Sequence, residues 1–317
     1  MLTLDAIVLS YAGDDASSTM TLRCIESMRE AIDQTKYRLR ITIVEGNTPH
    51  AMYVEHDRHD QFVDFPQETF NFNLAVRAGI KAAENFPVES GERNCILISN
   101  NDVIYEPDCL NQLIAGLEYV DSVSPWFPGF HNDWHQCGEK PATNIIEGLS
   151  VRGHICGWAY AFNRHILGGN PDLTIEGLFP ESICFWYQDN YYAEVLKLSK
   201  VRHALIRDAR AEHLNERSHE FMTAEEHAQA TAGMAGPYEA AVEELSLRFR
   251  NRAEEVGKSK RFLLTVCVCS LPERMSTTCA KLIRELERQA TAAGQVQILS
   301  LTDNRSKSVG CKRNELV

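Results

Sequence analysis

The chain has 317 residues, of which 44% are hydrophobic, and its formal net charge at pH 7 is −12. This length and apolar content are enough to bury one large core or two modest ones, and they exclude a disordered polymer. The acidic balance disfavours a general nucleic-acid binder, because such a protein needs a basic surface to displace counterions. Ten cysteines lie at irregular spacings, several of them inside apolar runs, so reduced and buried thiols are expected rather than disulfides.

The N-terminal sequence lacks the basic and apolar regions of a signal peptide. No apolar run approaches the length needed to span a bilayer. The sequence therefore predicts a cytoplasmic protein without a membrane partner.

Two short strands flank a helix in the first fifty residues. The apolar run at residues 6–9 ends at Ser10 and Tyr11, and apolar residues at spacings of three and four then indicate a helix. Residues 41–44 form a second strand that ends in Glu45, Gly46 and Asn47. Since the crossover in such a unit is right-handed, we expect these two strands to be parallel.

A further strand ends in a carboxylate. A helix is expected over about residues 70–84, and the apolar run at residues 95–99 then ends in Asn100, Asn101 and Asp102. Strands alternating with helices indicate a mostly parallel sheet covered by helices. In open sheets of this kind ligands bind at the carboxyl ends of the strands, which is where Asp102 falls. The alternative is that the tripeptide is only a polar turn.

The second half is less regular. Residues 121–180 form aromatic and Gly/Pro-rich loops around short strands such as residues 157–162, and substrate specificity usually lies in segments of this type. A capping box at residues 223–226 starts a helix, and Gly236 with Pro237 is expected to start another. These helices predict a linker over residues 221–260.

The last segment repeats the pattern of the first. Residues 261–317 contain an apolar strand, a helix and a strand that ends in Asp303 and Asn304, with a spacing similar to that between Ile7 and Asn47. This predicts an internal βαβ repeat. The expected organisation is one domain over residues 1–220, the helical linker, and a partial second unit that is either truncated or degenerate.

Taken together, these residues resemble the inverting, family 2-type glycosyltransferases of the GT-A fold over about residues 5–220. The parts that carry the resemblance are the end of the first strand, the turn at residues 44–47, the strand end at residues 100–102, the segment at residues 157–164, residues 186–189 before a helix, and His213. The resemblance implies a Rossmann-like, mostly parallel sheet. It also implies transfer of a sugar from a nucleotide-sugar donor to an acceptor hydroxyl, with inversion.

The resemblance implies a divalent cation, Mn²⁺ or Mg²⁺, with Asp102 and His213 as ligands, because the leaving nucleotide diphosphate gains negative charge. Asp189 matches the general base that takes the proton of the acceptor hydroxyl. Two alternatives stay open. Asp189 can be the N-cap of the helix that follows it, and His213 can be a surface histidine.

The resemblance also assigns residues to the donor and the acceptor. The nucleotide would lie against Ser10, Tyr11, Glu45, Asn47, Arg77 and Asn101. A UDP-sugar is the expected donor. Trp134, Trp186 and Tyr187 are candidates for an acceptor platform, because rings stack on sugar faces or on an extruded base, although such rings can also form a small core.

Residues 303–316 resemble segments of phage-encoded members of this group. This resemblance implies a hydroxymethylated DNA base as the acceptor, and the compartment would be the host cytoplasm if the chain is viral. A glycan or a protein acceptor stays open as an alternative. One basic groove would be enough for DNA despite the acidic net charge.

Two other classes are consistent with parts of the sequence. A sugar nucleotidyltransferase shares the sheet and the metal-binding carboxylate, but it usually opens with a Gly-rich basic loop, whereas residues 11–15 are acidic. A catalytically inactive module that binds sugar or nucleotide, or serves as a scaffold, is the other. The presence of both Asp102 and Asp189 favours an active enzyme.

Overall fold

The computed structural model describes residues 2–11, 14–47, 59–67, 71–86, 93–128, 130–131, 143–168, 173–184, 186–214 and 224–259. The predicted partial second unit at residues 261–317 lies outside the described residues, and so does Trp134. The chain divides into two compact units, Met1–Leu247 and Arg248–Val317, and the first of them contains the sheet.

The elements follow one another along the chain as β1 (Leu2–Ser10), α1 (Asp15–Glu30), β2 (Tyr37–Glu45), β3 (Gln61–Asp64), α2 (Phe72–Ala83), β4 (Asn94–Asn100), β5 (Val103–Tyr105), α3 (Cys109–Gly116), β6 (Ser122–Trp126), β7 (Ile145–Glu147), β8 (Ala159–Asn163), η4 (Arg164–Ile166), α5 (Ile175–Leu178), α6 (Gln188–Ser199), β9 (His203–His213) and α7 (Ala224–Ser259).

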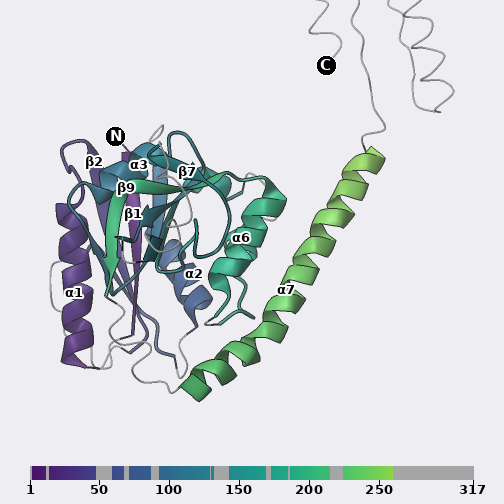
Figure 1. The fold of residues 1–317 in the computed structure, drawn as a ribbon, viewed down its shortest axis with the longest axis horizontal. Helices are drawn as coiled ribbons and strands as arrows, with labels where there is room; N and C mark the ends of the chain where they lie inside the picture. Colours follow the sequence, from purple (N-terminus) through teal and green to yellow (C-terminus); the bar gives the residue numbers. More distant parts are fainter. Residues whose placement is uncertain are drawn as a thin grey trace, which may run out of the picture. The chain divides into compact units, whose positions relative to one another are not determined.

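The described strands form one nine-stranded sheet (Figure 1). Its order is β3-β2-β1-β4-β8-β6-β9-β5, and β7 pairs with β9 off this path. Strands β3, β2, β1 and β4 are parallel to one another, and β6 is parallel to β9. Strand β8 is antiparallel to both β4 and β6, and β5 and β7 are antiparallel to β9. The chain thus has a mixed α/β fold with a mostly parallel central sheet, consistent with the predicted Rossmann-like GT-A fold.

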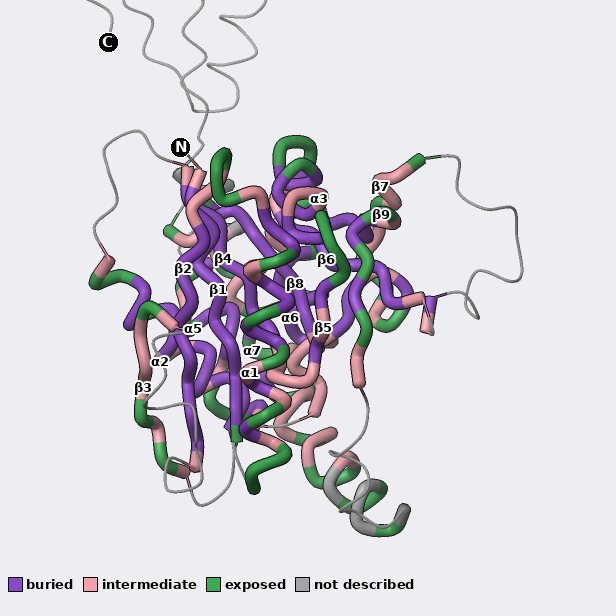
Figure 2. The backbone as a smooth tube through the Cα atoms, turned by 90° about the vertical axis from the view of Figure 1, so that its left-hand side faces the viewer, coloured by how far each residue is buried: buried purple, intermediate pink, exposed green. Residues whose placement is uncertain are grey.

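Helices cover both faces of the sheet, so β1 is buried almost throughout, as the tube in Figure 2 shows. Leu4, Ala6 and Val8 point to the face that α1 and α3 cover, where they join one apolar cluster with residues of both helices. Ile7 points to the other face, where its side chain closely approaches Gly79 of α2. A strand with two covered faces favours apolar residues on both of them, which explains the continuous apolar run at residues 6–9.

A buried ion pair lies in the first half of β1. Arg40 of β2 donates from Nε to Asp5 Oδ1 at 2.5 Å and from Nη2 to Asp5 Oδ2 at 2.8 Å. Asn94 of β4 donates to Asp5 Oδ2 at 2.8 Å, and Arg164 Nη1 lies 3.6 Å from that oxygen. The two arginines neutralise the Asp5 carboxylate. Its contacts link β1 to β2, to β4 and to η4.

Helix α7 is one continuous helix, so the prediction that Pro237 starts a new helix is wrong. Proline removes one backbone donor, and its ring crowds the carbonyl of the residue four positions earlier, but its fixed φ is compatible with a helix. Within the part of the chain that the structure describes, no helix is both long and apolar enough to cross a membrane.

Candidate active site

The carboxyl ends of β1, β2 and β4 lie at one edge of the sheet. Ser10 and Glu45 are register partners at the ends of β1 and β2. The backbone N–H of Gly46 donates to the Ser10 carbonyl at 2.9 Å, and that of Asn101 donates to the Leu9 carbonyl at 3.1 Å. Parallel pairing in register therefore brings three predicted donor-binding residues, Ser10, Glu45 and Asn101, to the same edge.

Polar side chains tie this edge to helix α1. Asn101 Nδ2 donates to Thr21 Oγ1 at 2.9 Å and to Ser10 Oγ at 3.3 Å, and the two hydroxyls are 3.0 Å apart. Asn101 thus fixes the turn after β4, which carries Asp102. Contact of Ser10 or Asn101 with a nucleotide stays a prediction.

The Glu45 carboxylate, at the turn that follows β2, is buried. Glu45 is fully buried, and its Oε1 accepts a hydrogen bond from the backbone N–H of Asn47 at 2.6 Å. Tyr11, by contrast, is 43% exposed just beyond the end of β1. Tyr11, Glu45 and Asn47 are all predicted to bind the nucleotide. Of these three residues, Tyr11 offers the accessible apolar surface, whereas the Glu45 carboxylate shapes the turn.

Arg77 of α2 lies at the loop that precedes α6. Its Nη1 is 4.0 Å from Glu181 Oε2. The loop is fastened to the start of α2, because the Phe72 N–H donates to the Cys184 carbonyl at 2.7 Å and Asn73 Nδ2 donates to the Pro180 carbonyl at 2.9 Å. The structure thus places Arg77 beside the segment leading to Asp189.

The structure brings the two predicted metal ligands together. Strand β5 is antiparallel to the end of β9, with Val103 opposite His213, so the preceding residue Asp102 lies beside the histidine. His213 Nε2 is 3.0 Å from Asp102 Oδ2. The Trp158 indole stacks on the imidazole with ring centroids 4.2 Å apart and an interplanar angle of 9°. A tryptophan that sequence analysis did not single out thus fixes the orientation of His213.

This pair fits a divalent cation. Asp102 Oδ1 is buried and has no hydrogen-bond partner, which leaves an anionic oxygen available to a ligand. Hard cations prefer carboxylate oxygen, and a nearby imidazole extends the donor set. Across the described ranges, no group of three or more His, Cys, Asp or Glu side chains is placed to hold a metal.

Asp189 lies in the first turn of α6. The N-cap residue of that helix is Tyr187, so the alternative that Asp189 is the N-cap is wrong. Burial raises the pKa of the Asp189 carboxyl, and the backbone N–H of Asn190, which donates to Oδ1 at 2.9 Å, and the charge of Arg152 offset part of that rise. A carboxylate with a raised pKa is a stronger base than one in water.

One short loop segment connects Asp189 with the metal-ligand pair. A Cβ atom at Gly157 would lie 3.5 Å from Asp189 Oδ2, so the glycine backbone lies directly against the carboxylate. The next residue, Trp158, carries the ring that stacks on His213. The backbone carbonyl of Trp158 accepts a hydrogen bond from the backbone N–H of Asn100 at 2.8 Å. Asp189 and His213 thus adjoin two consecutive residues, Gly157 and Trp158. Because β8 begins only at Ala159, these two residues belong to a loop and not to the predicted strand.

Two of the three predicted acceptor residues are described. Trp186 and Tyr187 are half-buried immediately before α6, and Tyr187 has a left-handed backbone with φ 66°. Its ring stacks on that of Tyr238 in α7, with centroids 4.9 Å apart and an interplanar angle of 16°. Tyr238 is a neighbour of the site that sequence analysis missed, since nothing in the local pattern distinguishes it from the other apolar positions of its helix.

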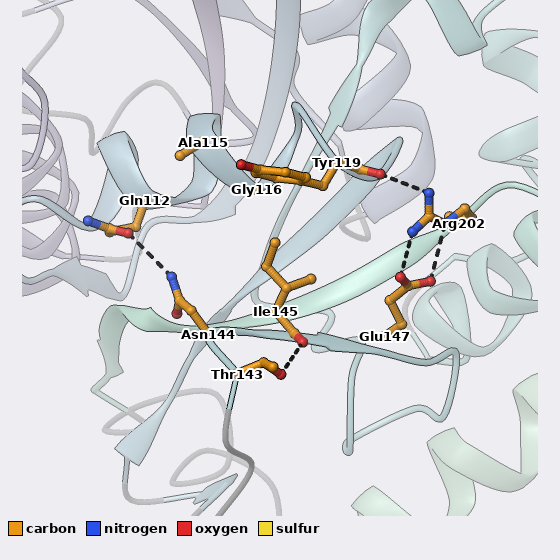
Figure 3. A pocket seen from close by; sticks show the side chains of 9 residues that line it. All are labelled: Gln112, Ala115, Gly116, Tyr119, Thr143, Asn144, Ile145, Glu147 and Arg202. Carbon is orange, nitrogen blue, oxygen red and sulfur yellow. Dashed lines mark hydrogen bonds and ion pairs between the residues drawn. The ribbon is translucent and has the colours of Figure 1, made fainter.

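A cavity of about 570 Å³ lies at the other end of β9 (Figure 3). Arg202, one residue before β9, donates to Glu147 Oε1 at 2.5 Å and to the Tyr119 carbonyl at 3.0 Å on its wall. His213 ends the same strand eleven residues on, about 36 Å away at the rise of an extended strand. The cavity is therefore separate from the candidate active site.

No family model matches the chain, and no curated protein sequence matches it. Among solved structures, S. aureus TarS is similar with a TM-score of 0.40 and 11% identity, over 65% of this chain and 35% of the TarS chain. A candidate nucleotide-diphospho-sugar transferase from Desulfovibrio desulfuricans is similar with a TM-score of 0.40 and 10% identity, over 77% of this chain and 98% of that one. The chain thus spans about a third of the length of TarS. Neither likeness is close enough to assign a function.

Proposed function

We propose that the chain is a glycosyltransferase that moves a sugar from a nucleotide-sugar donor to an acceptor hydroxyl, with inversion and with the help of a divalent cation. The observation that carries this proposal is the placement of the half-buried Asp189 carboxylate against Gly157 and of the Asp102–His213 pair at the ring of the next residue, Trp158. A base for the acceptor and an anion-neutralising site for the leaving group are the two chemical requirements of the reaction.

Asp189 would act as the general base. The acceptor hydroxyl oxygen attacks the anomeric carbon from the side opposite the diphosphate, the carbon–oxygen bond to the diphosphate breaks, and the hydroxyl proton moves to an Asp189 oxygen. Attack from the opposite side inverts the configuration at that carbon. Burial of Asp189 supports this role, because it raises the pKa of the carboxyl and so strengthens the ionised form as a base.

Asp102 and His213 would hold the cation, Mn²⁺ or Mg²⁺, which when bound supplies positive charge against the leaving nucleotide diphosphate. The stacked Trp158 ring holds the imidazole in place, and the buried Asp102 Oδ1 has no competing partner. We assign the nucleotide to the edge formed by Ser10, Tyr11 and Glu45, and a UDP-sugar is the proposed donor.

The first experiment is a thermal-shift screen of UDP-, GDP-, CDP- and dTDP-sugars, each with and without Mn²⁺ or Mg²⁺. A ligand that binds only the folded state raises the melting temperature by mass action. We expect a cation-dependent shift with one nucleotide class. Absence of a shift with every donor, on folded protein, would overturn the proposal in favour of a module without transferase activity.

Variants then separate the two roles. We expect Asp189→Asn to lower turnover by about 10²- to 10⁴-fold, measured as nucleotide release, while donor affinity stays near that of the wild type. Asp102→Ala should instead weaken cation-dependent donor binding. Asp208→Asn, at a half-exposed aspartate of β9, is the matched control and should behave as wild type. Full turnover by Asp189→Asn would refute the base assignment.

With the donor class known, radiolabelled donor is offered to glycans, to proteins and to hydroxymethylated DNA. Transfer to one of them identifies the acceptor class.

A further inference from the structure

Helix α7 contributes an aromatic side chain next to the start of α6. We propose that Tyr238 is a positioning residue for transfer, which by stacking on Tyr187 holds the first turn of α6 and therefore Asp189 in place. This inference rests on the role proposed for Asp189. It adds to the site an element that the sequence assigns to a linker.

The geometry places Tyr238 directly against the segment that carries the base. Its ring is nearly parallel to that of Tyr187, with centroids 4.9 Å apart and an interplanar angle of 16°. Burial raises the pKa of Tyr238, and the nearby carboxylates of Glu194 and Asp189 add to that rise. Tyr238 thus lies over the first two turns of α6, close enough to Asp189 for the two groups to interact electrostatically.

The start of α6 needs a contact of this kind. Tyr187 is the N-cap residue, and its φ of 66° is disfavoured for a residue with a Cβ atom. No side chain caps the helix at this position. The first helical hydrogen bond runs from the Tyr191 N–H to the Tyr187 carbonyl at 2.8 Å. A change in the Tyr187 backbone would therefore unwind the turn that contains Asp189.

Tyr238 is held firmly enough to serve this purpose. Ala241 and Leu245, three and seven residues further along α7, are buried, and Leu245 is fully so. These spacings put all three residues on one face of the helix. The contact with Tyr187 therefore belongs to a buried helix face and is not made by a loose side chain.

A consequence concerns the extent of the catalytic unit. If Tyr238 positions the base, the unit that performs transfer includes α7 through Leu245, beyond the predicted boundary at residue 220. This agrees with the first compact unit of the chain, which ends at Leu247.

The test compares full-length wild type, Tyr238→Ala, Tyr238→Phe and the matched control Tyr119→Ala, whose tyrosine is 65% exposed. Amide hydrogen exchange reports on residues 189–192, and steady-state kinetics with the nucleotide sugar selected in the binding screen report on turnover. Because an aromatic stack is worth a several-fold change in an opening equilibrium, exchange in Tyr238→Ala should be about threefold to tenfold faster. Its kcat should fall by about tenfold with little change in donor KM. Tyr238→Phe and Tyr119→Ala should resemble wild type in both measurements.

Unchanged exchange at residues 189–192 in Tyr238→Ala would overturn the inference, and so would a Tyr238→Phe variant as impaired as Tyr238→Ala. An increase in donor KM with unchanged kcat would also overturn it, since a positioning residue for the base acts on kcat. If wild type binds no nucleotide sugar, the proposed function fails, and with it the role in transfer. Faster exchange in Tyr238→Ala alone would then still support the structural coupling of Tyr238 to α6.

Discussion

Replacing Asp5 with alanine should destabilise the first unit of the chain strongly, although Asp5 lies in the half of β1 that is remote from the strand-end edge. The carboxylate is 1% exposed and accepts two hydrogen bonds from Arg40 and one from Asn94. Arg40 is itself buried, with 7% of its surface exposed. The variant would therefore remove the carboxylate that accepts hydrogen bonds from Nε and Nη2 of this buried guanidinium.

The magnitude follows from this burial. Removing one partner of a buried, hydrogen-bonded ion pair costs about 3–5 kcal/mol, because the remaining charge stays desolvated. A domain is stable by about 5–15 kcal/mol in total, so the loss is a large fraction of the whole. With a urea m-value of about 3 kcal/mol per molar, the unfolding midpoint should fall by about 1–1.7 M.

Urea unfolding followed by far-UV circular dichroism measures this difference. Asp5→Asn keeps the shape and one acceptor oxygen but loses the charge, so its midpoint should lie between those of wild type and Asp5→Ala. Asp208→Ala removes a carboxylate that is 53% exposed and should shift the midpoint by no more than the error of the fit. A loss below about 1 kcal/mol in Asp5→Ala would refute the reasoning, since it would mean that Arg40 is rehydrated or paired elsewhere.

Four further outcomes are expected. Because burial raises the pKa of Asp189, the acid limb of the kcat/KM profile should lie above the range of an ordinary aspartate; a limb in the usual range would contradict this. For the same reason the folded state binds this proton more tightly than the unfolded state. Protonation of Asp189 therefore stabilises the folded state at a pH below the unfolded-state pKa, and this stabilisation is lost as the pH rises through the folded-state pKa. At pH 7.5 the ionised carboxylate no longer supplies it, so Asp189→Asn should melt at a temperature equal to or above that of wild type. Trp158→Ala, which loses the stack on His213, should weaken cation-dependent donor binding by about 2- to 13-fold in calorimetry, and unchanged affinity would contradict the positioning of His213. Gly79→Ala should cost about 1–3 kcal/mol in urea unfolding, because its Cβ would overlap the Ile7 side chain, and a neutral effect would show that α2 can shift.

The sequence predicted the parallel half of the sheet well. Strands β1, β2 and β4 and helices α1 and α2 are found where apolar runs and three- and four-residue spacings predict them, because these patterns report burial of one face or of both. The ends of the apolar runs also predicted the ends of the strands. Ser10, Glu45 and Asp102 were therefore predicted at the edge of the sheet where the structure has them. The prediction failed at Pro237, since local propensity cannot tell whether a helix starts at a proline or tolerates it.

By itself, then, the sequence determined the order of strands and helices in the parallel half of the sheet and the polar residues at its strand ends, since both depend on neighbours a few positions apart. Only the tertiary structure decided which of those residues meet. The Trp158–His213 stack depends on β4 and β9 each pairing into the same sheet, and the approach of Gly157 to Asp189 depends on where α6 packs. The Tyr187–Tyr238 stack joins residues on different helices. Such contacts arise from the packing of whole elements, which periodicity along the chain does not encode.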